Sequence, residues 1–167
     1  MMRVVAPLKI ACMLLLVGAL SACSSTPAPE APTVTTPPPA SSIKPGSAED
    51  FRVNVGDTVF FDVDQHTVRP DAQSILQKQA AWLQKYPTVK LMVEGHCDER
   101  GTREYNLALG DRRAYAVKEY LVSLGVDGSR LQSKSYGKER PVCAESDDSC
   151  WQQNRRGFSV ISAGAGS

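Results

Sequence analysis

The stretch Val93-Glu-Gly-His-Cys-Asp-Glu-Arg-Gly-Thr-Arg-Glu-Tyr-Asn-Leu-Ala-Leu-Gly-Asp-Arg-Arg113 predicts a strand, a polar loop and then a helix. Asp98 and Arg100 lie in the loop, and Arg113 lies on the helix. At about 100° per residue, Arg113 falls in the middle of an apolar stripe, which consists of Leu109, Ala116, Val117, Tyr120 and Leu124. A guanidinium on an apolar face is costly unless it is paired. We therefore predict that loop and helix bring an acid and a base together in a pocket for a small ligand carrying both charges.

Each of these residues also has a purely structural interpretation. Arg113 could extend to water or pair permanently with an internal carboxylate. Asp98 could cap the turn that follows it, and Arg100 could be a solvated loop charge. Asn106 could cap the helix or bond the loop backbone. Spacing alone leaves both interpretations open.

The flanking sequence predicts a domain with the element order β-α-β-α-β-β. Pro70 favours a helix start, and apolar residues then repeat at helical spacing as far as Tyr86-Pro87. A second helix is predicted from about residue 103 to Gly125. Extended segments are predicted at 53–64, 89–93, 131–136 and 158–161, with a short helical turn within 146–154. The fold class that follows is α/β, a two-layer sandwich with the helices on one face of a small mixed sheet.

The N-terminal 22 residues are organised like a secretory signal peptide. Two basic residues precede an apolar run of 11 residues, Ile10–Leu20, which is shorter than the roughly 20 that a membrane-spanning helix needs. The sequence Leu20-Ser-Ala-Cys23 then resembles a bacterial lipobox, which predicts cleavage after residue 22 and lipidation of Cys23. By resemblance to Gram-negative lipoproteins, Ser24 predicts sorting to the outer membrane. The alternative is an ordinary signal peptide that leaves Cys23 as a spare thiol.

Composition divides the remainder into a tether and one domain. Residues 23–47 hold the lipidation site followed by a Pro-rich stretch with seven of the chain's 11 prolines, which predicts a disordered tether. Residues 48–167 are sufficient for one domain with a single core. Removal of the signal leaves 17 basic against 18 acidic residues, a net charge of −1. We therefore predict no nucleic-acid partner, because such binding favours a basic surface.

The cysteines predict one disulfide. Cys143 and Cys150 lie in a polar loop, and the compartment expected for a secreted protein is oxidising. A bond between them would stabilise the fold by about 2–3 kcal/mol on loop-entropy grounds. The alternative is a metal site that combines them with His96 and Cys97, but no zinc-ligand spacing is present. We predict no metal and no cofactor, and an unpaired Cys97 beside the pocket.

Five motifs in order between about Thr58 and Ser162 resemble the outer-membrane-protein-A-like peptidoglycan-binding domain family. They are Val59-Phe-Phe-Asp-Val-Asp64, Val93-Glu-Gly-His-Cys-Asp-Glu-Arg-Gly101, Glu104-Tyr-Asn-Leu-Ala-Leu-Gly-Asp-Arg-Arg-Ala114, Ser135-Tyr-Gly-Lys-Glu-Arg-Pro141 and Asn154-Arg-Arg156. The resemblance implies that the domain binds the peptide stem of peptidoglycan through meso-diaminopimelate, without cutting it. It assigns the ligand's ammonium to Asp98 and its carboxylate to Arg113. The further contacts predicted are Asp64, Arg100 and Asn106.

The resemblance to lipid-anchored members of that family also implies partners and a location. The partners are peptidoglycan and the Tol system, in particular the periplasmic protein TolB, with a role in envelope constriction at division. The location is the outer membrane, reached by a lipid anchor, with the domain in the periplasm. The chain departs from many relatives at Cys97, at Val63 and in the Cys143–Cys150 loop. Val63 stands where many have Phe, which could loosen packing against the peptide.

Two alternatives from other classes are open. Glu94, His96 and Asp98 would share one face of an alternating strand and could act as acid–base groups of a wall-modifying enzyme. No nucleophile motif accompanies them, so we predict that the protein is not an enzyme. A stator or porin-type member of the same family is the other alternative, and the lipobox disfavours it.

Overall fold

The computed structural model describes residues 43–166. The predicted signal peptide (1–22), the lipidation site Cys23 and the tether as far as residue 42 lie outside the described residues. The predictions made for them therefore stay predictions. The described chain leads directly into the folded domain, because Gly46 donates its N–H to Asp50 and Ser47 caps the first helical turn.

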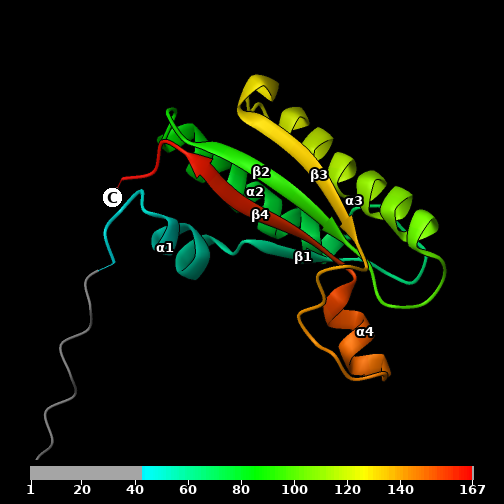
Figure 1. Ribbon diagram of the computed structural model, residues 1–167. Coiled ribbons are helices and arrows are strands. Elements are labelled where there is room, and N and C mark those ends of the chain that lie inside the picture. The colour runs from blue at the N-terminus through cyan, green and yellow to red at the C-terminus, as the bar shows by residue number, and fades with distance from the viewer. Residues whose placement is uncertain (1–42, 167) are drawn as a thin grey trace, which may run out of the picture. The chain divides into compact units, whose positions relative to one another are not determined.

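A four-stranded mixed sheet forms one layer of the domain (Figure 1). Its spatial order is β1 (Thr58–Phe60), β4 (Arg156–Ala163), β2 (Lys90–His96) and β3 (Leu131–Gly137). β4 is antiparallel to both of its neighbours, whereas β2 and β3 are parallel. The predicted α/β class and the mixed sheet are therefore confirmed.

Two long helices, α2 (Pro70–Lys85) and α3 (Arg103–Ser123), lie on one face of this sheet (Figure 1). Pro70 occupies the first turn of α2 as predicted, and the Thr102 side chain caps α3 by accepting from the N–H of Tyr105. The core lies between the layers and is apolar, consisting of Phe51, Val59, Phe61, Ala72, Leu76, Ala80, Trp82, Leu83, Val89, Leu91, Val93, Ala114, Val117, Leu121, Val126 and Leu131. The opposite face of the sheet carries no long helix among the described residues.

Within the extended segment predicted over 53–64, only Thr58–Phe60 is strand. Residues 53–55 instead belong to a π-helical turn, Phe51–Val55, which follows α1 (Ala48–Asp50). The reason is a long-range contact: Phe51 is buried edge-on against Trp82, with ring centroids 5.0 Å apart. Trp82 also donates its indole N–H to Asp50. A helical turn presents both residues to α2, which an extended chain would not.

One end of the sheet collects the loops that matter for function. β1 and β4 are antiparallel, as are β4 and β2, so the end of β1, the end of β2 and the start of β4 meet there. The short helix α4 (Asp148–Asn154) lies beyond the same end, within the connection from β3 to β4 (Figure 1). It confirms the predicted turn within 146–154. A 3-10 turn, η2 (Gly128–Arg130), precedes β3 at the opposite end.

Candidate ligand-binding site

Two glycines bring α3 close to β2 and thereby build the site. A Cβ on Gly95 would lie 1.8 Å from the carbonyl oxygen of Gly110, and a Cβ on Gly110 would lie 2.9 Å from the carbonyl oxygen of Gly95. Real side chains do not tolerate such separations, so this approach of helix to strand requires glycine on both sides. Arg113 follows Gly110 by just under one helical turn and is thus held over the end of β2.

Arg113 is fully buried, at 0% exposure, and is bound by backbone oxygens. Its Nη1 donates to the carbonyl of His96 (2.9 Å), its Nε to that of Gln65 (2.8 Å) and its Nη2 to that of Asp62 (3.1 Å). Burial lowers the pKa of Arg113, although a guanidinium stays protonated in proteins. Within residues 43–166 no carboxylate lies within ion-pair distance of it. Its burial agrees with the helical wheel, but its partners are carbonyls and not Asp98.

Asp98 is buried at the end of β2 and is bound by two other arginines. Oδ1 accepts from the N–H and the Nε of Arg100, both at 3.2 Å. Oδ2 accepts from Nη2 of Arg100 at 2.8 Å and from Nη1 of Arg155 at 3.2 Å. Burial raises the pKa of Asp98, but the hydrogen bonds from Arg100 and then Arg155 outweigh it, so the pKa lies below its ordinary value. Asp98 is therefore a paired carboxylate at neutral pH.

Two further predicted residues shape the surrounding loops. Asn106 is buried and donates to the carbonyls of Arg100 (2.7 Å) and Thr102 (3.0 Å), so it holds the loop backbone. Asp64 has a positive φ of 58° and accepts a hydrogen bond from the hydroxyl of Tyr105. This bond, the largest of several causes, raises the pKa of Tyr105.

These side chains line one pocket of about 320 Å³. All five predicted contacts are among its lining residues, which are Val63, Asp64, Cys97, Asp98, Arg100, Gly101, Tyr105, Asn106, Leu109, Arg113 and Arg155. Sequence reasoning missed Arg155 and Tyr105. The motif Asn154-Arg-Arg156 was a signal for Arg155, but no periodicity indicates which of its arginines reaches Asp98.

Cys97 lies in the pocket wall as an unpaired, buried thiol. Its Sγ donates to the carbonyl oxygen of Asn106 at 3.3 Å, and burial raises its pKa. The thiol is therefore protonated at neutral pH, and its role in the pocket wall is structural.

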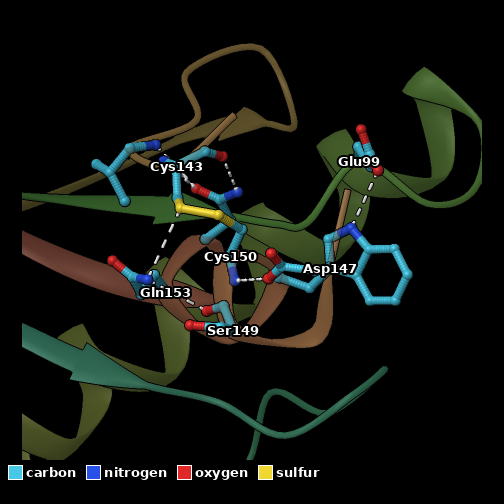
Figure 2. The surroundings of a disulfide bond; sticks show 9 residues. Glu99, Cys143, Asp147, Ser149, Cys150 and Gln153 are labelled. Atoms are coloured by element: carbon cyan, nitrogen blue, oxygen red, sulfur yellow. Dashed lines mark hydrogen bonds between the residues drawn. A yellow bond between two sulfur atoms is a disulfide. The ribbon is translucent and has the colours of Figure 1, made fainter. Parts of the chain in front are cut away.

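A disulfide between Cys143 and Cys150, with Cα atoms 5.0 Å apart, joins α4 to the loop that precedes it (Figure 2). Asp147 caps α4 by accepting from the N–H of Cys150, and Asn154 both donates to and accepts from the backbone of Cys143. The indole N–H of Trp151, on α4, donates to Glu99 in the loop of the site at 3.0 Å.

His96, considered above as an acid–base group, lies on the opposite side of β2 from α3. Its ring stacks on Tyr136, with centroids 5.5 Å apart, and its Nε2 is 3.5 Å from Oε2 of Glu94. Burial, and then the charges of Arg156 and Arg140, lower its pKa to about 4. The side chain is therefore a buried neutral imidazole, and only its backbone carbonyl faces Arg113.

The fold and the site together define a class: a single α/β domain with a small polar pocket at one end of a mixed sheet. The model of the OmpA family matches residues 60–155. The peptidoglycan-associated lipoprotein of Rhizobium meliloti (strain 1021) is 59% identical over 128 residues, which cover 77% of this chain and 72% of that protein. The chain therefore belongs to the OmpA family and, within it, to the peptidoglycan-associated lipoproteins.

Solved structures agree with this assignment. The peptidoglycan-associated lipoprotein from Burkholderia pseudomallei is similar with a TM-score of 0.62 at 43% identity, over 63% of this chain and 89% of that one. The C-terminal domain of Helicobacter pylori MotB (residues 125–256) is similar with a TM-score of 0.60 at 25% identity, over 64% and 84% of the two chains. No helix among residues 43–166 is long and apolar enough to cross a membrane.

Proposed function

We propose that the pocket binds the diaminopimelate end of the peptidoglycan peptide stem, so that the protein links the outer membrane to the cell wall. The observation that carries the proposal is that one pocket of about 320 Å³ is lined by both the Asp98 carboxylate and the Arg113 guanidinium. The names of its relatives, peptidoglycan-associated lipoproteins, support peptidoglycan as the binding partner.

The chemistry of the two groups suits a zwitterionic ligand. The end of a diaminopimelate side chain carries an ammonium and a carboxylate. A guanidinium has five N–H donors, three of which Arg113 uses on backbone carbonyls, so donors remain for a ligand carboxylate. Asp98, ionised because its pKa is lowered, can accept from the ammonium. Partial burial strengthens both contacts relative to water.

The role proposed is non-covalent attachment. A pocket whose charged groups are held by hydrogen bonds to backbone and to each other is suited to binding, and the imidazole of His96 faces away from it. Cys23 would carry the lipid that attaches the protein to the outer membrane, and the Pro-rich segment would act as a spacer.

The wider role proposed follows from the family. We infer that the protein acts with the Tol system and that TolB is its protein partner in envelope integrity and division. Co-purification of the two full-length proteins tests this inference separately from wall binding. Retention of TolB on the immobilised protein is the expected result, and its absence at micromolar concentrations would refute the partnership.

Wall binding is tested with full-length protein purified in detergent. Sedimentation with purified peptidoglycan and calorimetry with a diaminopimelate-containing muropeptide give the affinity. We expect Asp98→Ala and Arg113→Met each to lose more than about tenfold in affinity, because each removes one charged arm. Arg112→Met is the matched control, since Arg112 is exposed on the same helix and should bind like wild type.

Circular dichroism is used to confirm that each variant is folded. Equal binding by all variants would place the ligand elsewhere on the protein. Absence of binding by the wild type would refute the proposed function itself.

A further inference from the structure

The acceptor positions of Asp98 are already occupied. A carboxylate offers about four lone-pair positions, and Asp98 accepts four hydrogen bonds, three from Arg100 and one from Arg155. An ammonium ligand therefore cannot be added to this arrangement. It has to replace a donor that is already there.

Of the two arginines, Arg100 is the one whose side chain can leave. The Arg155 side chain is 8% exposed and also donates to the carbonyl of Phe61 and to Gln152. The Arg100 side chain is 41% exposed. Apart from Asp98, its guanidinium contacts the ring of Trp151, 4.2 Å from the ring centre. Because the Arg100 guanidinium borders on solvent, it can move into water when it leaves Asp98, so this arginine can exchange for a ligand.

The loop backbone is held independently of that side chain. The carbonyl of Arg100 accepts from Asn106 at 2.7 Å. Lys138 Nζ donates to the carbonyls of Glu99 (2.9 Å) and Gly101 (2.7 Å). The Arg100 guanidinium can therefore move away from Asp98 while the loop and the carboxylate stay in position.

Trp151 is placed by the disulfide-closed segment. Cys150, next to it on α4, is buried and bonded to Cys143, and Asn154 fastens the end of α4 to the Cys143 backbone. The neighbouring Asp148 adds a negative charge that contributes to the raised pKa of Arg100, although the hydrogen bond to Asp98 is the largest cause. The α4 segment thus holds the Arg100 guanidinium over Asp98.

We propose that Arg100 is an internal competitor for the ligand's ammonium, and that Trp151 sets how strongly it competes. The inference rests on the proposed function, and it adds a reason for ligand selectivity. A displaced Arg100 is a cation without its carboxylate. A diaminopimelate end supplies a new carboxylate in the same pocket, whereas a lysine side chain supplies only an ammonium. Of these two ligands, only the zwitterionic one therefore supplies both an ammonium for Asp98 and a carboxylate for the displaced Arg100.

The test compares Trp151→Ala with Trp151→Phe in full-length protein, using calorimetry with the diaminopimelate muropeptide. A cation–π contact at an exposed site contributes about 0.5–1 kcal/mol, so Trp151→Ala should bind about two- to fivefold more tightly than wild type. Trp151→Phe keeps an aromatic face, loses the N–H bond to Glu99, and should bind like wild type. Tighter binding on loss of a side chain next to the pocket is not expected of a merely structural residue.

Trp151→Ala could instead bind more weakly than wild type or equally well, while Asp98→Ala still abolishes binding. That result would refute the proposal that Arg100 competes with the ligand, and the proposed function would stand. If the wild type does not bind, the proposed function fails. NMR of the ligand-free protein then tests separately whether Trp151 holds the Arg100 guanidinium against Asp98. The Asp98 pKa should then rise toward its ordinary value in Trp151→Ala, and the Arg100 Nε–H should exchange faster. An unchanged Asp98 pKa and exchange rate would show that Trp151 does not hold Arg100.

Discussion

Arg113 and Arg100 line the same pocket, but the protein holds them in opposite ways. Arg113 is fully buried and bound by three backbone carbonyls, one at the end of β2 and two in the loop after β1. Arg100 is partly exposed and bound by two side chains, Asp98 and Trp151. Backbone partners cannot change without unfolding, whereas side-chain partners can. The comparison shows that one half of the pocket is built into the fold and the other half is adjustable.

The half of the pocket that is built into the fold, which contains Arg113, depends first on the close approach of α3 to β2. Gly95→Ala is the most severe test of that approach. The new Cβ would lie 1.8 Å from the carbonyl oxygen of Gly110, so the two backbones would have to separate. We expect a loss of more than about 3 kcal/mol in the free energy of unfolding, measured by urea denaturation.

Gly128→Ala is the matched control for that substitution. Its Cβ would meet only Val122 Cγ2, at 3.6 Å, an ordinary contact. Its stability should stay within about 0.5 kcal/mol of wild type. Equal effects of the two substitutions would show that the helix does not depend on its close approach to β2.

Arg113→Met should have the next largest effect on stability. The substitution preserves an unbranched apolar stem but leaves the carbonyls of His96, Gln65 and Asp62 without their donor. Each buried unsatisfied group costs roughly 1–3 kcal/mol, partly relieved by water, so we expect a loss of about 3 kcal/mol. Arg112→Met, one residue earlier and exposed, should change the free energy of unfolding by under about 0.5 kcal/mol.

The burial of Arg113 could be predicted from sequence, whereas its partners could not. Helical periodicity is local, so the wheel placed Arg113 on the buried face of α3 without further information. Its acceptors belong to β2 and to the loop after β1, 17, 48 and 51 residues away in sequence. Which atoms meet across such distances depends on how the strands are ordered in the sheet.

The adjustable half was less predictable for the same reason. Arg155 reaches Asp98 across 57 residues because β4 returns antiparallel beside β2. Trp151 reaches Arg100 because α4 lies at that end of the sheet.

The N-terminal strand was predicted too long, because its β-branched and aromatic residues favour extended chain locally while Phe51 gains more by packing on Trp82. Local patterns thus predicted the elements, and tertiary contacts determined the site.

The pH dependence of stability tests the half of the pocket that is built into the fold, because His96 belongs to it. The His96 carbonyl binds Arg113, and its buried ring stays neutral at neutral pH. Its pKa is about 4 in the folded protein, against 6.5 ordinarily. Above pH 6.5 neither state binds the proton, and below it the unfolded state binds the proton first. Stability should therefore fall by about 3 kcal/mol between pH 6.5 and pH 4. The depressed pKa of Asp98 adds a further loss only at lower pH, below the ordinary carboxyl range.

Thermal denaturation across this pH range measures the effect. His96→Phe retains a ring against Tyr136 and removes the titrating group, so the slope between pH 6.5 and pH 4 should flatten. Gly128→Ala is the control, because it changes no titrating group and makes only an ordinary contact, so it should leave the slope unchanged. A wild-type slope that survives in His96→Phe would assign the pH dependence to other groups.

Arg100→Met should have the smallest effect on stability and the most informative effect on binding. The Arg100 side chain is 41% exposed, but its removal takes two hydrogen bonds from the buried carboxylate of Asp98, which keeps Arg155, so the free energy of unfolding should fall by about 1–2 kcal/mol. Without the internal competitor, an ammonium can reach Asp98 without displacing a cation. A lysine-containing stem peptide should therefore gain affinity relative to the diaminopimelate muropeptide, and the ratio of the two dissociation constants should move toward one. If both ligands lose affinity by the same factor, Arg100 contributes only attraction, and the two halves of the pocket differ in burial but not in function.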